Sequence, residues 1–358
     1  MKFGLFNLMS YRDNPGGLPG VMSDMDTMVG IAEDIGFDVA WFAEHHFTNY
    51  SVSVSPLVMA GFVAGRRRKI RVGAAVVVLP LYQPLRIAQE IALVDQLSEG
   101  RFVLGVGTGY QPYEFDRYGV KVENKTEIFL DYWEVLEQAL MTGHVNHRGP
   151  YVDLPETVVL LKTRSGGMPP LFVTSVDPRV LKRLAKHNPT PFLTAGWRGT
   201  EVLYGMAEHA RGNWQTAGLG AMPIAVQQYI HVTDSKAEAL EAAERARFVA
   251  RMVAAFRSPD VALAGGSMVV PPPLPDEPPL EVFRDNLLIG DPHLVAEKLI
   301  AEIRRLGMTH YNSFFQFGDM PIARAAKSLS RFGAEVLPLV EKELGPLDAI
   351  GTPAAAAA

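Results

Sequence analysis

Short apolar stretches alternate with longer amphipathic stretches along almost the whole chain, and this alternation restricts the possible folds most strongly. Residues 39–42 (VAWF) and 102–106 (FVLGV) are typical of buried strands, and each is followed by a stretch with helical spacing. Strands that alternate with helices form parallel sheets, because a helical crossover returns the chain to the same end of the sheet. The predicted strands are 3–8, 39–42, 70–79, 102–106, 171–174, 191–195, 224–232 and 311–317, and the predicted helices are 23–36, 55–65, 84–99, 127–141, 179–187, 201–215, 237–256 and 322–344.

Eight strand and helix units predict an α/β fold, the closed (β/α)8 or TIM barrel, with an open doubly wound sheet as the competing architecture. Two segments interrupt the repeat. Residues 145–167 have short apolar runs between turn residues and predict a hairpin inserted between strands 4 and 5. Residues 264–280, between strands 7 and 8, are rich in proline and predict a lid or a structureless connector. We expect one domain over 1–350 and a disordered tail over 351–358.

Composition excludes several classes of protein. The 358 residues are 48% hydrophobic, but none of the apolar runs reaches the roughly 18 residues of a membrane span, and the start MKFGLFNLM lacks the features of a signal peptide. We therefore expect a cytoplasmic protein without a membrane partner. The net charge is -5 and the one basic cluster, residues 66–69, is short, so we expect no nucleic-acid partner. The absence of cysteine leaves histidines, carboxylates, hydroxyls or a borrowed cofactor for any chemistry.

The second predicted strand ends abruptly in a carboxylate and two imidazoles, Glu44, His45 and His46. Barrel enzymes place their active sites at this carboxyl end of the strands, so the three residues predict a site. The structural alternative is that one histidine satisfies a backbone carbonyl and the other caps the strand. A shared metal ion is disfavoured, because neighbouring residues on a strand point to opposite faces.

Three other predicted strands end in residues that suit a flat ring or an anion. Residues 73–75 (GAA) are small, and 105–110 (GVGTGY) contains three glycines whose amides are open to an anion. Residues 174–177 (TSVD) lead directly through Pro178 into a helix N-terminus. Many such loops bind nothing, so the pattern alone does not identify a ligand.

Several stretches, taken in order, resemble the bacterial-luciferase-like flavin monooxygenases. They are MKFGLFNL, GFDVAWFAEHHF, IRVGAAVVVLPLYQPLRIAQEIALVDQLSEGRFVLGVGTGY and YEFDRYGV. The likeness covers most of residues 1–200 closely and the remainder more loosely. The Asp177–Pro178 pair is similar to the branch of the family that contains the limonene monooxygenases.

The resemblance implies a two-component monooxygenase. Reduced FMN, supplied by a separate flavin reductase, would bind across the barrel top and activate O2 to oxidise a small apolar organic substrate. The resemblance also implies His45 as the catalytic acid and base with Glu44 beside it, and a non-proline cis peptide between Ala75 and Val76 next to the flavin ring. The cofactor-binding residues it implies are Ala75, Val76, Gly107, Thr108, Tyr110, Thr174, Ser175, Val176 and Asp177.

Two departures from the family concern the predicted flavin site. Gly107 stands where the luciferase itself has a cysteine, and Thr108 stands where relatives often have an arginine. The phosphate would then rest on hydroxyls and amides with one positive charge fewer. Asp177 suits such a site only if its carboxylate caps its own helix.

Two alternatives stay open on the same barrel. One is a deazaflavin-dependent dehydrogenase or reductase, which would transfer hydride instead of activating oxygen, and the other is a non-catalytic flavin-binding protein. A nicotinamide site is not predicted, because no G-x-G-x-x-G motif follows a strand with an acidic residue about 20 positions on.

The second predicted helix indicates an oligomer. Residues 55–65 (SPLVMAGFVAG), from Ser55 to Gly65, contain no charged side chain, so one face can cover the barrel while the other would expose apolar groups to water. We therefore predict a homodimer through this helix. The alternative is that an insertion from the same chain covers the face.

Overall fold

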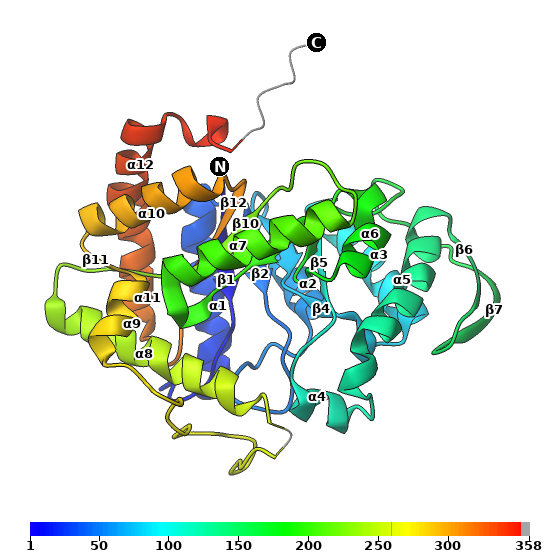
Figure 1. The fold of residues 1–358 in the computed structure, drawn as a ribbon, viewed down its shortest axis with the longest axis horizontal. Helices are drawn as coiled ribbons and strands as arrows, with labels where there is room; N and C mark the ends of the chain where they lie inside the picture. The colour runs from blue at the N-terminus through cyan, green and yellow to red at the C-terminus, as the bar shows by residue number, and fades with distance from the viewer. Residues whose placement is uncertain (259, 352–358) are drawn as a thin grey trace.

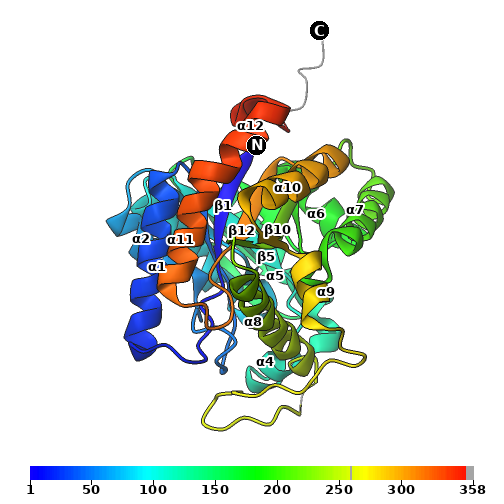
Figure 2. The ribbon, with the colours of Figure 1, turned by 90° about the vertical axis from the view of Figure 1, so that its left-hand side faces the viewer.

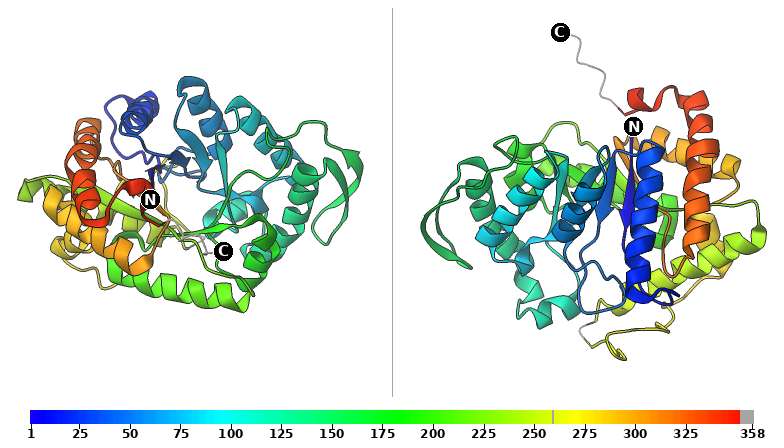
Figure 3. Two further views of the ribbon diagram at one scale, coloured as in Figure 1. Left: turned by 90° about the horizontal axis from the view of Figure 1, so that it is seen from above. Right: turned by 180° about the vertical axis from the view of Figure 1, so that it is seen from behind.

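A closed parallel barrel forms the centre of the molecule in the computed structural model, which describes residues 1–258 and 260–351. Strand β12 pairs with both β10 and β1, and β10 also pairs with β9, so the sheet has no break. The predicted (β/α)8 barrel is thus confirmed, and Figure 3 shows helices around the strands from above. The strands are β1 (Lys2–Asn7), β2 (Val39–Phe42), β3 (Arg71–Ala74) continued by β4 (Val77–Val78), β5 (Phe102–Gly107), β8 (Leu171–Val173), β9 (Thr190–Leu193), β10 (Ala225–Val232) with β11 (Leu288–Gly290) at its end, and β12 (His310–Phe314).

The outer layer is helical, and α1, α2 and α11 cover one flank together (Figure 2). The main helices are α1 (Gly17–Asp34), α2 (Pro56–Arg66), α3 (Pro84–Leu97), α5 (Lys125–Met141), α6 (Pro178–Leu184), α7 (Gly199–Thr216), α8 (Lys236–Ala255), α10 (Pro292–Leu306), α11 (Ile322–Arg331) and α12 (Leu337–Leu344), with the short α4 (Pro112–Arg117) and α9 (Leu280–Asn286). In the described part of the chain, none of these helices is long and apolar enough to cross a membrane.

Three predicted boundaries were wrong for local reasons. Helix α1 begins at Gly17 and not at Ser23, because the Asn14 side chain accepts from the Gly16 amide and Pro19 fits the first helical turn. The predicted strand 70–79 is interrupted after Ala74, where a cis peptide joins Ala75 to Val76. The last strand ends at Phe314 instead of residue 317.

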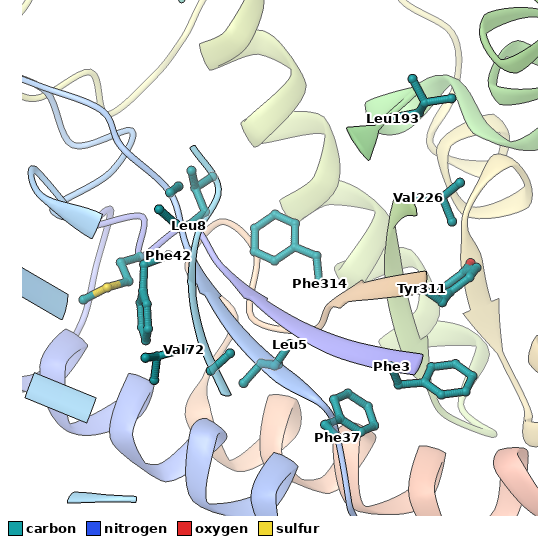
Figure 4. Packing of buried hydrophobic residues seen from close by; sticks show 14 of the residues in the cluster. Phe3, Leu5, Leu8, Phe37, Phe42, Val72, Leu193, Val226, Tyr311 and Phe314 are labelled. Carbon is teal, nitrogen blue, oxygen red and sulfur yellow. The ribbon is translucent and has the colours of Figure 1, made fainter. Parts of the chain in front are cut away.

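The lower barrel is filled with side chains. Trp41 packs inside it against Phe172 and Phe192, and its indole Nε1 donates to Asn312 Oδ1 at 2.7 Å. A Cβ added at Gly73 would lie 2.4 Å from the indole, so a glycine is needed for the tryptophan to fit. Between the barrel and its helices a second apolar layer includes Phe3, Leu5, Phe37 and Val72 (Figure 4). The cavity at the carboxyl ends of the strands lies above this packed interior.

The two predicted insertions are present. Strands β6 (His144–Arg148) and β7 (Asp153–Val158) form the antiparallel hairpin between strands 4 and 5 of the barrel. The proline-rich segment 264–280 has no helix or strand before α9 except an isolated bridge, and it lies with α4 at the end of the barrel opposite the N-terminus (Figure 1). Asn49, in the loop after β2, holds this segment through hydrogen bonds with Met268 and Gly266. The predicted tail lies outside the described residues from 352 onward.

Candidate active site

A cavity of about 730 Å³ opens at the carboxyl ends of the strands, above the packed interior. Loops after β2, β3, β5, β8 and β9 line it together with the inner face of α7. Most of the predicted site residues meet here although they come from separate parts of the sequence. They are Glu44, His45, Ala75, Val76, Thr108, Tyr110, Thr174, Ser175 and Val176, whereas Gly107 and Asp177 lie outside the lining.

His45 is held by a carboxylate that the sequence reasoning missed. Its Nδ1 lies 3.0 Å from Glu114 Oε1, and that same oxygen accepts from the backbone amide of His46 at 2.8 Å. Glu114 lies on α4, and its side chain is only 4% exposed. The arrangement fixes the imidazole at the cavity wall and directs its other nitrogen away from the carboxylate. The stretch YEFDRYGV contained this glutamate, but its pairing with residue 45 is a tertiary contact without a sequence signal.

Glu44 is buried behind the same wall. Its Oε1 lies at hydrogen-bond distance, 3.0 Å, from His46 Nε2. Its Oε2 accepts hydrogen bonds from the Tyr82 hydroxyl at 2.8 Å and from the Val78 amide at 3.1 Å. Burial raises the pKa of Glu44 against the opposing effect of these donors. The two histidines thus have different carboxylate partners. Among the described residues no cluster of three metal-ligating side chains exists.

Small and β-branched side chains, Ala75, Val76 and Val78, line one part of the cavity. The predicted cis peptide between Ala75 and Val76 is confirmed. At Gly107 an added Cβ would lie 2.6 Å from Thr174 Oγ1 and 2.7 Å from Val76 Cγ2, so these two side chains pack directly over the β5 backbone. A cysteine would not fit there unless these side chains moved. The surface can accept a planar ring.

The far end of the cavity suits an anion. Thr174, Ser175 and Val176 form it, and Asp177 points away as the N-cap of α6, accepting from the Arg179 amide at 2.8 Å. The Arg179 guanidinium holds the pKa of Asp177 below its usual value. The cap interpretation is therefore confirmed, and the carboxylate is neutralised by its own helix.

Two further side chains, which line the cavity or hold a loop that lines it, were not predicted from the sequence. Lys125, at the start of α5, donates from Nζ to the Gly109 carbonyl at 2.8 Å, and burial lowers its pKa. His209 of α7 lines the cavity beside Asn213, whose amide holds the Val176 carbonyl at 3.0 Å. Both come from helices, whereas the residues that the sequence predicted lie at or just after strand ends.

The aromatic side chains in and around the barrel divide into two groups. Tyr110 lines the cavity with its ring 5.9 Å from that of His45, and Tyr50 lies 4.6 Å from the same imidazole. Trp41, Phe315 and Phe317 are fully buried, so they belong to the core and not to the cavity. Tyr113 is buried as well, and Trp197 stacks on Phe283 of α9.

The sequence matches known proteins over most of its length. The family described as "Luciferase-like monooxygenase" matches residues 1–310. The chain is 32% identical over 352 residues to the uncharacterized protein y4vJ of Sinorhizobium fredii, which covers 98% of this chain and all of that protein. It is 30% identical over 175 residues to the alkanal monooxygenase alpha chain of the Kryptophanaron alfredi symbiont, about half of each chain (49% and 49%).

Solved structures share the fold. The oxygenating constituent of 3,6-diketocamphane monooxygenase from Pseudomonas putida, in complex with FMN, superposes with a TM-score of 0.73 at 20% identity over 94% of this chain and 98% of that one. An F420-dependent secondary alcohol dehydrogenase superposes with a TM-score of 0.67 at 18% identity over 95% and 98%. By the match over residues 1–310, the chain belongs to the luciferase-like monooxygenase family.

Proposed function

We propose that this chain is a flavin-dependent monooxygenase that uses reduced FMN and O2 to oxidise a small apolar organic substrate. The observation that carries the proposal is an imidazole held by a carboxylate, His45 with Glu114, at the edge of a cavity that Ala75, Val76 and the hydroxyl residues Thr174 and Ser175 also line. Family membership and the FMN complex of the camphane enzyme support it.

The residues present fit the flavin. The Ala75–Val76 segment would lie against the ring, and the Val76 and Thr174 side chains that pack over Gly107 would support it from behind. Thr108 and Tyr110 would lie beside the ring, and the hydroxyls of Thr174 and Ser175 with the amide of Val176 would hold the phosphate. Lys125 would hold the loop after β5 in place through the Gly109 carbonyl.

His45 would move protons at the reacting edge of the bound flavin. A neutral imidazole that donates from Nδ1 to Glu114 leaves Nε2 free to accept or return a proton. Bound reduced flavin would supply the electrons that O2 requires. Tyr110 and Tyr50 would shape the space above the imidazole for the organic substrate.

The second candidate is a deazaflavin-dependent dehydrogenase or reductase. The fold likeness to the F420-dependent alcohol dehydrogenase and the uncharged Thr108 favour it. An anaerobic titration of the chain with reduced FMN, and a second one with reduced deazaflavin, distinguish the two candidate functions. Protein fluorescence reports binding in both titrations. We expect the tighter complex with FMN. Tight binding of the deazaflavin with weak binding of FMN would contradict the proposal and favour the dehydrogenase.

The chain would work with two partners in the cytoplasm. A separate flavin reductase would supply the reduced cofactor, and a second copy of the chain would cover α2. On this helix Val58 is 69% exposed and Phe62 is 48% exposed, and on the neighbouring α3 Leu93 and Leu97 are also exposed. An apolar surface over two adjacent helices is typical of an interface. In the described part of the chain, the hairpin of β6 and β7 packs on α5 and does not cover this face (Figure 1).

A further inference from the structure

One face of α7 lines the active-site cavity and carries a single imidazole. Val202, Gly205, Met206 and His209 lie at helical spacing, so they share this face of the helix. The first three carry no charge, which leaves His209 as the one ionisable side chain that α7 brings to the lining. Helix α7 lies beside α6, the helix that follows the predicted anion end of the cavity (Figure 1).

His209 is tied to the loop that forms this end. The Asn213 amide nitrogen lies 3.0 Å from the Val176 carbonyl oxygen and 3.1 Å from His209 Nε2. Because a carbonyl oxygen can only accept, the NH2 group of Asn213 faces both partners and donates to both. His209 Nε2 is therefore an acceptor, and the neutral ring carries its proton on Nδ1. One amide group thus joins the imidazole to the loop 174–176.

The second ring nitrogen is available to a ligand. Nδ1 of His209 has no hydrogen-bond partner among the residues that the structure describes, and the side chain is exposed at the cavity wall. Asn213 restrains the ring, so little ordering of the side chain is needed when Nδ1–H meets an acceptor.

Positive charge is otherwise scarce at this end of the cavity. Among the described lining residues, His45 and His209 are the two whose side chains can become cationic, and His45 is paired with a carboxylate. Arg179 of α6 is engaged by two carboxylates, and Lys125 donates to a backbone carbonyl. Thr108 offers a hydroxyl where relatives often have an arginine.

We propose that His209 recognises the phosphate of bound FMN by donating a hydrogen bond from Nδ1, and that Asn213 positions its ring. The inference rests on the proposed function, because it requires FMN in this cavity. It goes further by assigning selectivity to α7. A phosphate with a charge of roughly -2 gains more from this donor than a neutral hydroxyl does. The site should therefore select FMN over riboflavin, which ends in a hydroxyl at the same place.

Anaerobic titrations of the full chain with reduced FMN and with reduced riboflavin test this assignment. Protein fluorescence gives a dissociation constant for each flavin. His209→Phe keeps an aromatic ring but removes the donor, so FMN should bind roughly tenfold more weakly, because a hydrogen bond to a charged group is lost. The affinity for riboflavin should change by less than about twofold, because no charged acceptor is present. His209→Asn places an amide N–H near the position of Nδ1 and should retain most of the affinity for FMN.

A second histidine and a second readout separate the contact from a structural role. His293→Phe, which replaces an exposed histidine at the start of α10 outside the cavity lining, should leave both dissociation constants unchanged. The phosphorus NMR resonance of bound FMN should move in His209→Phe and stay in place in His293→Phe.

Three results would count against these assignments in different ways. Equal weakening of FMN and riboflavin in His209→Phe would overturn the phosphate contact in favour of a structural role for the ring. Unchanged FMN affinity in His209→Phe, or a loss in His209→Asn as large as in His209→Phe, would also overturn the contact and leave the proposed function standing. A wild type that binds neither flavin would overturn the proposed function itself.

Discussion

His45 is bonded to a carboxylate 69 residues further along the chain, and this pair explains why its side chain is fixed at the cavity wall. The sequence identified His45 and Glu44 from their position after a buried strand. It could not identify Glu114, because a helical glutamate among other charged residues shows no sign of its tertiary partner. The roles of Gly107 and Lys125 likewise depend on the approach of distant segments.

His45→Ala should abolish turnover while keeping the fold. Its imidazole contributes proton transfer, so we expect the rate to fall by roughly 10²- to 10⁴-fold with the melting temperature and the flavin dissociation constant little changed. Stopped-flow kinetics, calorimetry and a flavin titration measure the three quantities. His144→Ala, which removes an exposed imidazole from the β6–β7 hairpin, is the control. A melting temperature that falls along with the rate would return His45 to a structural role.

His310 should make the fold sensitive to acid. Burial, with the nearby charges of Lys2, Arg71 and the N-terminus, lowers its pKa to about 4. The folded protein therefore favours the neutral ring, and the stability this gives is present above the unfolded pKa of about 6.5 and is lost as pH falls toward 4. Between pH 7 and pH 4 the wild type should lose about 3 kcal/mol more than His310→Asn in its free energy of unfolding. Denaturant titrations of both proteins at the two pH values measure the free energy of unfolding. An equal loss in the wild type and in His310→Asn would contradict a lowered pKa of His310 in the folded state.

At the scale of elements, the sequence predicted which strands and helices exist better than where they begin and end. The helix over 55–65 was placed to within a residue, because Ser55 is an N-cap whose side chain accepts from the Val58 amide. The start of α1 was missed because a glycine turn and Pro19 allow a helix without a capping side chain. The break after Ala74 came from the family resemblance and not from the Val-rich pattern, which predicts a continuous strand.

We predict that the exposed face of α2 is buried in a homodimer interface. Val58 points outward, whereas Val63 is fully buried, so the outward position is the one to charge. Val58→Glu should shift the sedimentation coefficient from that of a dimer to that of a monomer, because an interface buries the carboxylate without a partner. Val282→Glu, on an exposed valine of α9, should leave the dimer intact. A wild type that sediments as a monomer at micromolar concentration would contradict the interface.

At the scale of the whole molecule, the barrel was predictable because short stretches typical of strands alternate with longer amphipathic stretches along almost the whole chain. The position of the site was predictable too, since barrel strands deliver their carboxyl ends to one face. The shape of the cavity was not. It depends on Trp41 filling the barrel below and on α4 and α7 bringing Glu114 and His209 to the rim, contacts that only the assembled fold defines.

The central claim is that the site uses flavin to activate oxygen. It is tested most directly in a stopped-flow spectrophotometer, where the anaerobic complex of the chain with reduced FMN is mixed with a solution of O2. We expect a transient absorbing species to appear before the spectrum of oxidised FMN, and His45→Ala to alter its decay. Direct recovery of oxidised FMN at the rate of free flavin in solution, with no transient, would contradict the account.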